Sequence, residues 1–483
     1  MTVTTASLEA LRARYGERYK WLVMLTVMVG MVASIMSSTI VNVAIPDLSR
    51  HFVIGQERAQ WVSAAFMVAM TLSMLLTPWL MQRFGLRKTY LGATLLLMMA
   101  GIVGGFATNY PLLIAMRAAE GFSAGVIQPI PNILIMRSFP RNEQGRAMGI
   151  FGFGVLLAPA MGPTVGGLLV EYFGWRSIFF VVVPFCLVGI GLGRKLLATG
   201  TGASEKDEKP LDWVGLSLVS FATICVLNGL VELHHPSAVQ PWVLLGLGAL
   251  AFPVFIVHQL RARRPMLELR LAARAQVGMG AIVGFLYGFG LFGSTYLLPV
   301  YVQEALGYSP SAAGLVMLPA GIALGLAIPV AGRLADRLHP DRLVMFGIVV
   351  LGIFTASMAL FSPATPFIVT TLCVMFSRIG LGLIATPLSL ASVHDLAPEE
   401  VSHAVSMTSF MRQFGGSMGV SVVGIVLEWR LRVKGVSLSD PAITAASKAN
   451  AFDELFIALA LTIMLAAIAA WHMKSGRRRV PRG

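Results

Sequence analysis

Charged residues are scarce in this chain. Asp, Glu, Lys and Arg make up 12% of its 483 residues, whereas 56% are hydrophobic and the mean hydropathy is +0.76. An ordinary soluble chain is about 25% charged, so this composition argues against a soluble globular protein. Acidic residues are scarcer than basic ones, which gives a net charge of +14. Because the basic residues fall between apolar runs, we interpret them as a membrane pattern and not as a nucleic-acid surface.

Cysteine is almost absent. Cys186, Cys225 and Cys373 lie far apart, each inside an apolar run. Such residues are typical of small apolar side chains within helices, so no disulfide, redox function or metal site is predicted. The eight histidines have no metal-ligand spacing either.

Catalytic patterns are also missing. The phosphate-binding pattern G-x-x-x-x-G-K-[ST] does not occur, which argues against an ATP-driven pump. No catalytic triad or carboxylate dyad stands out. We therefore predict that the chain is not an enzyme and needs no cofactor.

Long apolar runs are what the chain has in abundance. Fourteen of them approach the about 20 residues that a bilayer-crossing helix requires. They lie at 21–45, 60–80, 89–108, 111–136, 145–169, 177–196, 213–233, 242–260, 276–302, 311–331, 342–361, 366–393, 404–428 and 454–472. An even number of crossings places both termini on one side of the membrane.

The distribution of Lys and Arg indicates which side that is. With a cytoplasmic N-terminus, 27 of the 37 basic residues lie in inside segments, 7 lie outside and three lie within spans. Basic residues favour cytoplasmic loops, so we predict cytoplasmic termini in the inner (plasma) membrane. Two loops deviate: 394–403 has no Lys or Arg, and 429–453 has four.

The first six spans correspond to the last six. PWLMQRFGLRK follows the second span and AGRLADRLHPDR follows the tenth, while Arg117 and Pro129 of the fourth span match Arg378 and Pro387 of the twelfth. We predict a cytoplasmic arm, an N-terminal six-helix bundle, linkers with two inserted transmembrane helices, a C-terminal six-helix bundle and a basic cytoplasmic tail. Their ranges are 1–20, 21–196, 197–275, 276–472 and 473–483. Paired bundles are the architecture of an alternating-access transporter.

The fourth span carries two charges. Arg117 and Glu120 lie one helical turn apart and share a face. Glu120 is nine residues from Pro111, hence roughly 14 Å deep at about 1.5 Å per residue. Charges at that depth are costly unless functional. Two interpretations stay open: Glu120 and Arg117 couple transport to protons, or they form a fixed structural pair.

The fifth span carries a stripe of small residues at every fourth position. These are Gly154, Ala158, Gly162 and Gly166, with Pro163 and Gly167 beside them. Such a stripe allows another helix to approach closely, and the proline favours a bend. Simple close packing and a gating role are both open.

Five motifs occur in order along the chain: STIVNVAIPDL from Ser38, PWLMQRFGLRK from Pro78, MRAAEGFSAG from Met116, APAMGPTVGG from Ala158 and GWRSIFFVVVP from Gly174. Together they resemble the major facilitator superfamily, in its fourteen-helix drug:proton antiporter branch (the EmrB/QacA type). The resemblance covers nearly the whole chain. It implies an all-α polytopic membrane protein with the major facilitator fold, built from two six-helix bundles plus two inserted helices (14 transmembrane helices).

The chain departs from the branch pattern at several positions. Ser37 replaces the usual acid of the first helix, Pro78 and Gln82 replace the glycine and the aspartate of the first loop, Glu120 replaces a glutamine, and Ala158 replaces a glycine. The resemblance assigns gating roles to Arg83 and Gly85 in the first loop and to a latch formed by Asp336 and Arg337 in the second half. The family's first-helix acid is not carried over.

These patterns favour a secondary transporter that exports small amphipathic compounds in exchange for protons. We assign Ser37, Asn42, Arg378 and Arg412 to the substrate cavity. Arginines outnumber acids within the spans, so we expect neutral, weakly acidic or anionic substrates, although Arg412 could equally bond to backbone carbonyls. A lipid, metabolite or siderophore exporter and a proton-symport importer remain alternatives.

The expected partners follow from this function. They are the small-molecule substrate, protons and the lipid bilayer, with no nucleic acid. A monomer is expected as the transport unit, and a periplasmic adaptor protein is left open. If Glu120 does not carry the proton, Glu304 or His403 is the next candidate.

Overall fold

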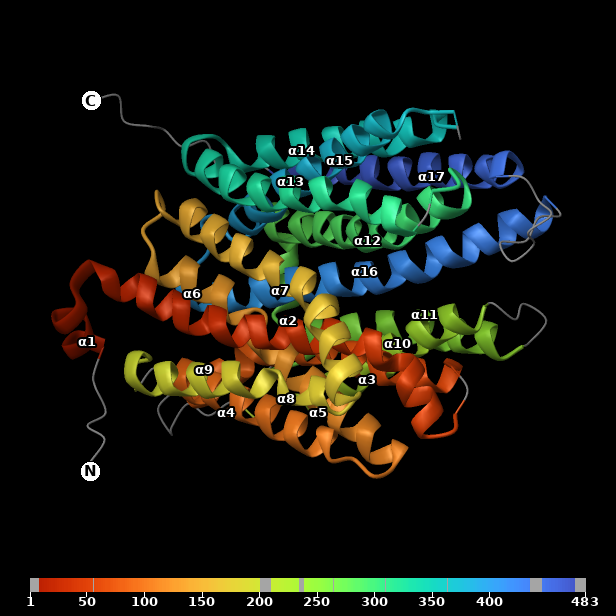
Figure 1. Cartoon of the computed structure of the whole chain (residues 1–483). Helices are drawn as coiled ribbons and strands as arrows, with labels where there is room; N and C mark the ends of the chain where they lie inside the picture. Colours follow the sequence, from red (N-terminus) through yellow and green to blue (C-terminus); the bar gives the residue numbers. More distant parts are fainter. Residues whose placement is uncertain are drawn as a thin grey trace.

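The fold was examined in a computed structural model. The structure describes residues 8–54, 56–199, 210–233, 239–263, 265–308, 310–362, 364–434 and 445–473. Every regular element within these ranges is a helix (Figure 1). This agrees with the predicted all-α class.

The first half of the chain forms a bundle of long helices with short connections. Its elements are α1 (Leu8–Tyr15), η1 (Gly16–Arg18), α2 (Tyr19–His51), α3 (Gln56–Ser73), η2 (Met74–Leu76), α4 (Thr77–Gly105), α5 (Tyr110–Ile127), α6 (Ile130–Ser138), α7 (Gln144–Phe173), α8 (Ser177–Phe180) and α9 (Val182–Leu196).

Two further helices precede a second bundle. The two are α10 (Trp213–Glu232) and α11 (Gln240–Arg261), followed by η4 (Leu269–Ala273). The second bundle comprises α12 (Ala275–Glu304), α13 (Pro310–Arg337), α14 (Pro340–Ser357), η5 (Met358–Leu360), α15 (Phe367–Ser392), α16 (Pro398–Val433) and α17 (Ala445–His472).

Membrane-compatible helices dominate the described residues. Eleven segments are long and apolar enough to cross a bilayer, fewer than the fourteen expected. One of them, Trp61–Gly105, includes both the second and the third predicted spans. Between these spans α4 consists of two helices joined by a kink at Gly85, which adopts φ 75° and ψ 164°. A residue with a side chain rarely adopts that conformation, which is why glycine occupies the break.

The fourth predicted span is also interrupted. It comprises α5 and α6, separated at Gln128 and Pro129. A proline lacks the amide that would continue the helical hydrogen-bond ladder, so the helix is interrupted there. The predicted span 111–136 runs through Pro129 without a break.

The two bundles repeat one packing pattern. In the first, α2 contacts α3, α7 and α9, while α5 contacts α3 and α4, and α4 contacts α9. In the second, α12 contacts α13, α16 and α17, while α15 contacts α13 and α14, and α14 contacts α17. Each of these contacts in one bundle therefore has its counterpart in the other, which is the arrangement that the internal repeat predicts.

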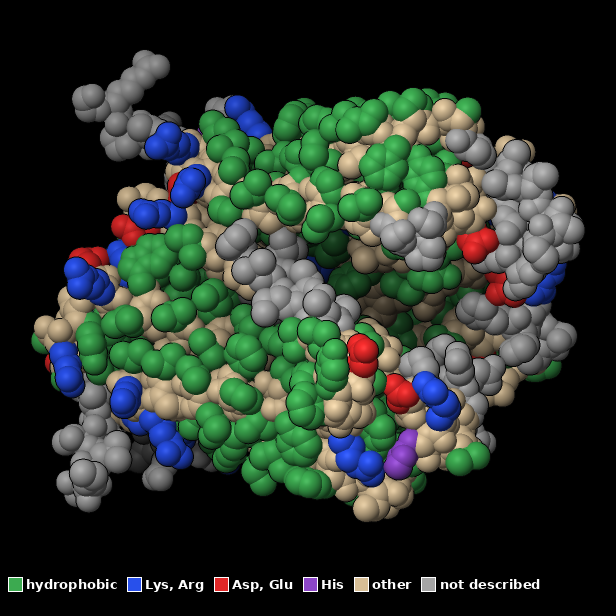
Figure 2. Space-filling model, in the orientation of Figure 1, with side chains coloured by type: hydrophobic (Ala, Val, Ile, Leu, Met, Phe, Trp, Pro, Cys, Tyr) green, Lys and Arg blue, Asp and Glu red, His purple; other side chains and the backbone are tan. Residues whose placement is uncertain are grey.

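The bundles meet mainly along α7 and α13. On another side, α10 contacts both α16 of the second bundle and α3 of the first. Both chain termini lie at the same end of the molecule (Figure 1), which we call the terminal end. The outer surface carries many apolar side chains (Figure 2), including Leu461 (64% exposed) and Trp471 (77% exposed), as expected for helices that face lipid.

Candidate functional site

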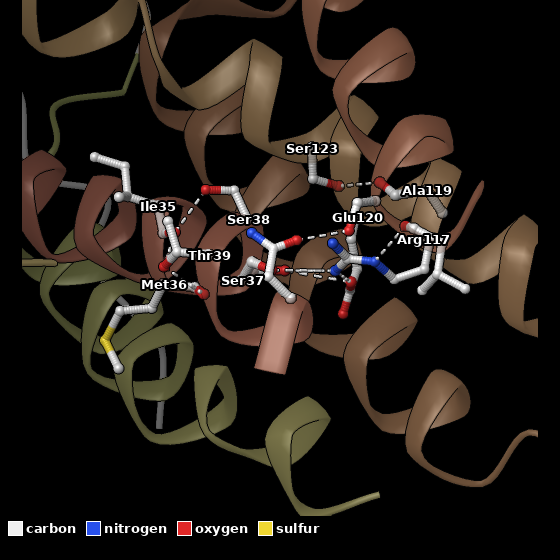
Figure 3. Close-up of polar contacts among 12 residues, drawn as sticks. Ile35, Met36, Ser37, Ser38, Thr39, Arg117, Ala119, Glu120 and Ser123 are labelled. Atoms are coloured by element: carbon white, nitrogen blue, oxygen red, sulfur yellow. Dashed lines mark hydrogen bonds and ion pairs between the residues drawn. The ribbon is translucent and has the colours of Figure 1, made fainter. Parts of the chain in front are cut away.

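A buried ion pair lies inside the first bundle. Arg117 and Glu120 of α5 are each 1% exposed and contact each other through Nη1 and Oε2. Ser37 of α2, 2% exposed, donates to Glu120 Oε2 at 3.2 Å and accepts from Arg117 Nη1 at 3.1 Å. The three side chains point toward one another (Figure 3). Pairing and hydrogen bonding together offset the cost of burying these charges.

The arginine is held by groups other than the acid. Its Nε donates to the carbonyl of Val62 at 3.1 Å, and its Nη1 donates to the carbonyl of Ser37 at 3.3 Å. Its guanidinium lies 4.4 Å from the ring centroid of Phe66, a cation–π distance. α3 packs closely against α5 because Gly121 has no side chain: a Cβ there would lie 2.1 Å from the carbonyl oxygen of Phe66.

A central cavity of about 350 Å³ lies between the two bundles, and Figure 2 shows the surface hollowed between them. The first bundle contributes Met31, Ser34, Ile35, Ser38, Thr39, Asn42, Met67, Met70, Gln128, Asn132, Met148, Phe151 and Gly152. The second contributes Tyr287, Leu291, Phe292, Ile328, Ala385, Thr386, Ser389, Arg412 and Gln413. The lining is mixed apolar and polar, which suits an amphipathic ligand.

Two of the predicted cavity residues line this cavity. Asn42 accepts a hydrogen bond from Ser63 Oγ at 2.8 Å. Arg412 of α16 is the single charged residue among the described lining residues, and all four lining methionines belong to the first bundle.

Ser37 and Arg378, also assigned to the cavity, are not among its lining residues. Ser34 and Ser38 of α2 face the cavity, whereas Ser37 points to Arg117 and Glu120. Adjacent residues of a helix point about 100° apart, since a turn takes 3.6 residues. Arg378 is 7% exposed and donates to Ser294 Oγ of α12 at 3.1 Å.

The terminal end is closed by contacts between α7 and α13. Asp336 Oδ1 accepts from the amide of Gly145 at 2.7 Å, and its Oδ2 accepts from the amide of Arg146 at 2.8 Å. We call this contact the Asp336 latch. An anion at a helix N-terminus is favoured by the free amides and the helix dipole. Arg337, the next residue, is exposed at the end of α13.

Glycines allow these two helices to touch. A Cβ at Gly145 would lie 2.1 Å from the carbonyl oxygen of Gly332, and one at Gly149 would lie 2.7 Å from Cα of Pro329. These glycines precede the predicted stripe, and sequence reasoning missed their role. Their spacing of four residues could have revealed it.

A second contact joins the bundles near the break in α4. The side chains of Gln82 and His403 approach to 2.9 Å, and Arg141 pairs with Asp395 at 3.3 Å. Arg83, predicted to act in gating, lies over the rings of Trp79 and Phe84 at 5.6 and 5.7 Å. Sequence reasoning noted Gln82 and His403 separately but did not pair them.

The glycine stripe of the fifth span lies in α7. A Cβ at Gly154 would lie 2.8 Å from Sδ of Met28, and one at Gly166 would lie 2.6 Å from Cγ1 of Ile40, so both face α2. Gly167 has open space around it. The side-chain positions of Ala158, Gly162 and Pro163 lie outside the described residues.

Metal ligation finds no support among the described residues, which contain no cluster of three or more His, Cys, Asp or Glu side chains. The three cysteines are buried and unpaired with one another. The described residues therefore provide a buried ion pair, a cavity lined by both apolar and polar side chains, and a contact between α7 and α13 at the terminal end.

Several known proteins are similar to this chain over most of its length. The chain is 29% identical to the "Multidrug resistance protein B homolog" of Mycobacterium tuberculosis, covering 86% of this chain and 78% of the relative. It is 29% identical to "Multidrug export protein EmrB" of Escherichia coli (80% and 76% covered) and 25% identical to "Riboflavin transporter RibZ" of Clostridioides difficile (84% and 87% covered). The first two of these relatives are consistent with a drug:proton antiporter branch.

A solved structure shares the fold. The "proton:xylose symporter XylE" superposes with a TM-score of 0.65 at 15% identity, over 95% of this chain and 96% of that one. Residues 27–420 match the model of the Major Facilitator Superfamily. Because that match spans most of the chain and the helices have the same arrangement, this protein belongs to the Major Facilitator Superfamily.

Proposed function

We propose that this chain is a secondary transporter that exports small amphipathic compounds in exchange for protons by alternating access. The observation that carries the proposal is the central cavity, which is lined from both bundles and closed toward the terminal end by the Asp336 latch. A substrate held there touches both halves, so a change in how they pack would expose it to the opposite side.

The proposed topology has fourteen crossings. The eleven membrane-compatible segments give fourteen crossings under three conditions. Trp61–Gly105 counts as two crossings, α5 and α6 together count as one, and α7 counts as one. The predicted domain boundaries at 20, 196, 275 and 472 are kept with it. We place both termini in the cytoplasm and the protein in the inner membrane, with a monomer as the transport unit and a periplasmic adaptor protein as an open partner.

Proton coupling is assigned to Glu120 together with Arg117. The pair contacts α2 through Ser37, and the neighbouring face of α2 lines the cavity through Ser34 and Ser38. A proton on Glu120 would weaken its bonds to Arg117 and Ser37 and so alter how α2 packs against α5. This arrangement links the proton site to the substrate cavity through one helix, without direct contact between proton and substrate.

A second candidate function is transport of a metabolite. The observation that favours it is the family relative named as a riboflavin transporter, together with the polar groups of the cavity. Lipid or siderophore export belongs to the same alternative. A symporter of the same fold keeps proton-driven import open as well.

Drug susceptibility and transport into everted vesicles test the proposal. Cells that express the chain should tolerate amphipathic drugs better than empty cells, and a protonophore should abolish the difference. Ser389→Trp places a large side chain in the cavity and should abolish transport. The control Leu372→Trp changes a residue on the outer surface of the same helix and should transport normally.

The outcomes separate the candidates. Full transport by Ser389→Trp would reject the cavity as the route. Accumulation that is insensitive to the protonophore would reject proton coupling. Proton-driven uptake into intact cells, without protection from drugs, would favour the importer.

A further inference from the structure

A cavity larger than the central one lies away from the substrate route. It has a volume of about 810 Å³, more than twice that of the central cavity. Segments of the first bundle line it: α1 with η1, the start of α2, α4 around its break, the end of α6 and the residues after α9. We call it the arm cavity, because α1 of the N-terminal arm forms one of its walls.

The floor of the arm cavity is apolar. Val23, Ile133, Leu134 and Leu197 line it and are at most 6% exposed overall, so they belong to the core of the first bundle. Leu8 of α1 lines the opposite wall and is 37% exposed. An apolar space of this volume is within the size range of ligand sites.

The rim of the arm cavity is basic. Arg12, Lys20 and Arg137 line it, against one acid, Glu17. Lys20 pairs with Glu17 at 2.9 Å and with Glu143 at 2.8 Å, so its charge is already neutralised. Neither Arg12 nor Arg137 forms an ion pair with a described residue. Glu399 lies near enough to interact electrostatically with Arg137 but does not line the cavity, so the charges that line the apolar floor remain mainly positive.

We propose that the arm cavity binds an anionic phospholipid. Its phosphate would lie between Arg12 and Arg137, and its acyl chains would cover the apolar floor. This placement of the lipid rests on the proposed topology, in which the terminal ends of the spanning helices lie at the membrane surface, where lipid headgroups are found. Basic pockets between helices at that level suit anionic headgroups. A free inorganic anion would leave the apolar floor exposed to water, so the lipid is the occupant that matches both parts.

Native mass spectrometry of the purified, delipidated chain tests this. The probes are phosphatidylglycerol and phosphatidylcholine with identical acyl chains. The parent should bind one phosphatidylglycerol in preference to phosphatidylcholine. At about 1 kcal/mol per basic residue near a charged lipid surface, Arg12→Gln with Arg137→Gln should weaken phosphatidylglycerol binding about thirtyfold.

Two comparisons make the result specific. Arg14→Gln with Arg261→Gln removes the same charge from exposed positions at the same end and should leave the preference unchanged. Ala198→Trp fills the arm cavity without changing charge and should abolish binding of both lipids to this site. Each variant must elute as a single folded species.

Three results would overturn the proposal. They are equal affinity of the parent for the two lipids, an equal loss in the control pair, and displacement of phosphatidylglycerol by inorganic phosphate alone. The last result would mean that the arginines bind a free anion. Drug transport is not the readout, so failure of the export proposal would leave this test intact.

Discussion

The buried arginine recurs in both bundles, but its acid does not. Arg117 of α5 corresponds to Arg378 of α15, and each bonds a serine of the first helix of its bundle. The position of Glu120 is occupied in the repeat by Leu381. Among the described residues no acid pairs with the buried Arg378, so this part of the fold accommodates the arginine without one. That comparison favours a functional role for Glu120 over simple neutralisation of Arg117.

Glu120→Gln should therefore uncouple transport from protons. The amide keeps the shape and can still accept from Arg117, so the protein should fold. Active efflux and its pH dependence should be lost, while exchange of labelled for unlabelled substrate continues. Reconstituted vesicles with an imposed pH gradient measure both. Ser37→Ala is the control for a lost hydrogen bond alone, and a parental rate with parental pH dependence in Glu120→Gln would exclude the acid as the coupling group.

Arg412 should set the preference for substrate charge. It is the single charge among the described residues that line the cavity, and a hydrogen bond to a charged group contributes about 1.5–3 kcal/mol. Arg412→Gln should lower export of an acidic amphipathic compound about tenfold or more and leave its neutral ester unaffected. Arg412→Lys should retain part of the preference. Strong resistance to divalent quaternary cations, with none to acidic uncouplers, would contradict this assignment.

At the scale of elements, α7 and α13 form the closed seam at the terminal end. Their backbones touch at Gly145 and Gly332, and the carboxylate of Asp336 binds the amides that begin α7. Release of this carboxylate must precede any separation of the two helices. The latch thus adds to the barrier between the closed arrangement and one open at the terminal end.

Asp336→Asn should weaken the closed seam. The amide keeps one acceptor but loses the negative charge, which is worth about 1 kcal/mol at a helix N-terminus. The open fraction should rise about fivefold, measured as thiol labelling of a cysteine introduced into α6. The matched control is Arg337→Gln at the exposed neighbouring position. Unchanged labelling in Asp336→Asn would show that the latch contributes nothing to closure.

The sequence predicts the helices well and their faces poorly. Apolar length predicted most of the membrane-compatible helices, and the repeated motifs predicted that the two halves pack alike. These patterns did not predict which side of α2 or of α15 faces the cavity, because a membrane helix is apolar toward lipid and toward protein alike. They therefore could not tell that Ser37 and Arg378 are absent from the residues that line the central cavity. The contact between Gln82 and His403 joins residues 321 positions apart, which no local pattern reveals.

At the scale of the whole molecule, the two bundles are alike in packing and unlike in their contacts at the terminal end. The loop aspartate of the second half binds helix amides, whereas Gln82 at the matching position of the first half binds the side chain of His403. One contact uses a carboxylate and the other an amide side chain. The carboxylate contact lies on α7 and α13, the pair of helices through which the bundles chiefly meet.

Joining the bundles at Gln82 and His403 should stop transport. Gln82→Cys with His403→Cys, linked by a short reducible thiol crosslinker, fixes the terminal end closed. Efflux should cease on crosslinking and return on reduction, while each single cysteine variant should be unaffected by the reagent. The native cysteines are buried and should not react. Continued efflux in the crosslinked protein would mean that this end of the seam need not open.

The unequal walls of the central cavity have a chemical consequence. Met31, Met67, Met70 and Met148 all lie on the side of the first bundle, and oxidation converts a thioether into a polar sulfoxide. Peroxide should therefore make the wall formed by the first bundle more polar and leave the wall that contains Arg412 unchanged. Transport of the most apolar substrates should weaken as a result. Exchange of the four methionines for leucine should make transport resistant to peroxide. Such a protein would be an exporter whose range of substrates narrows under oxidative stress and is restored by sulfoxide reduction.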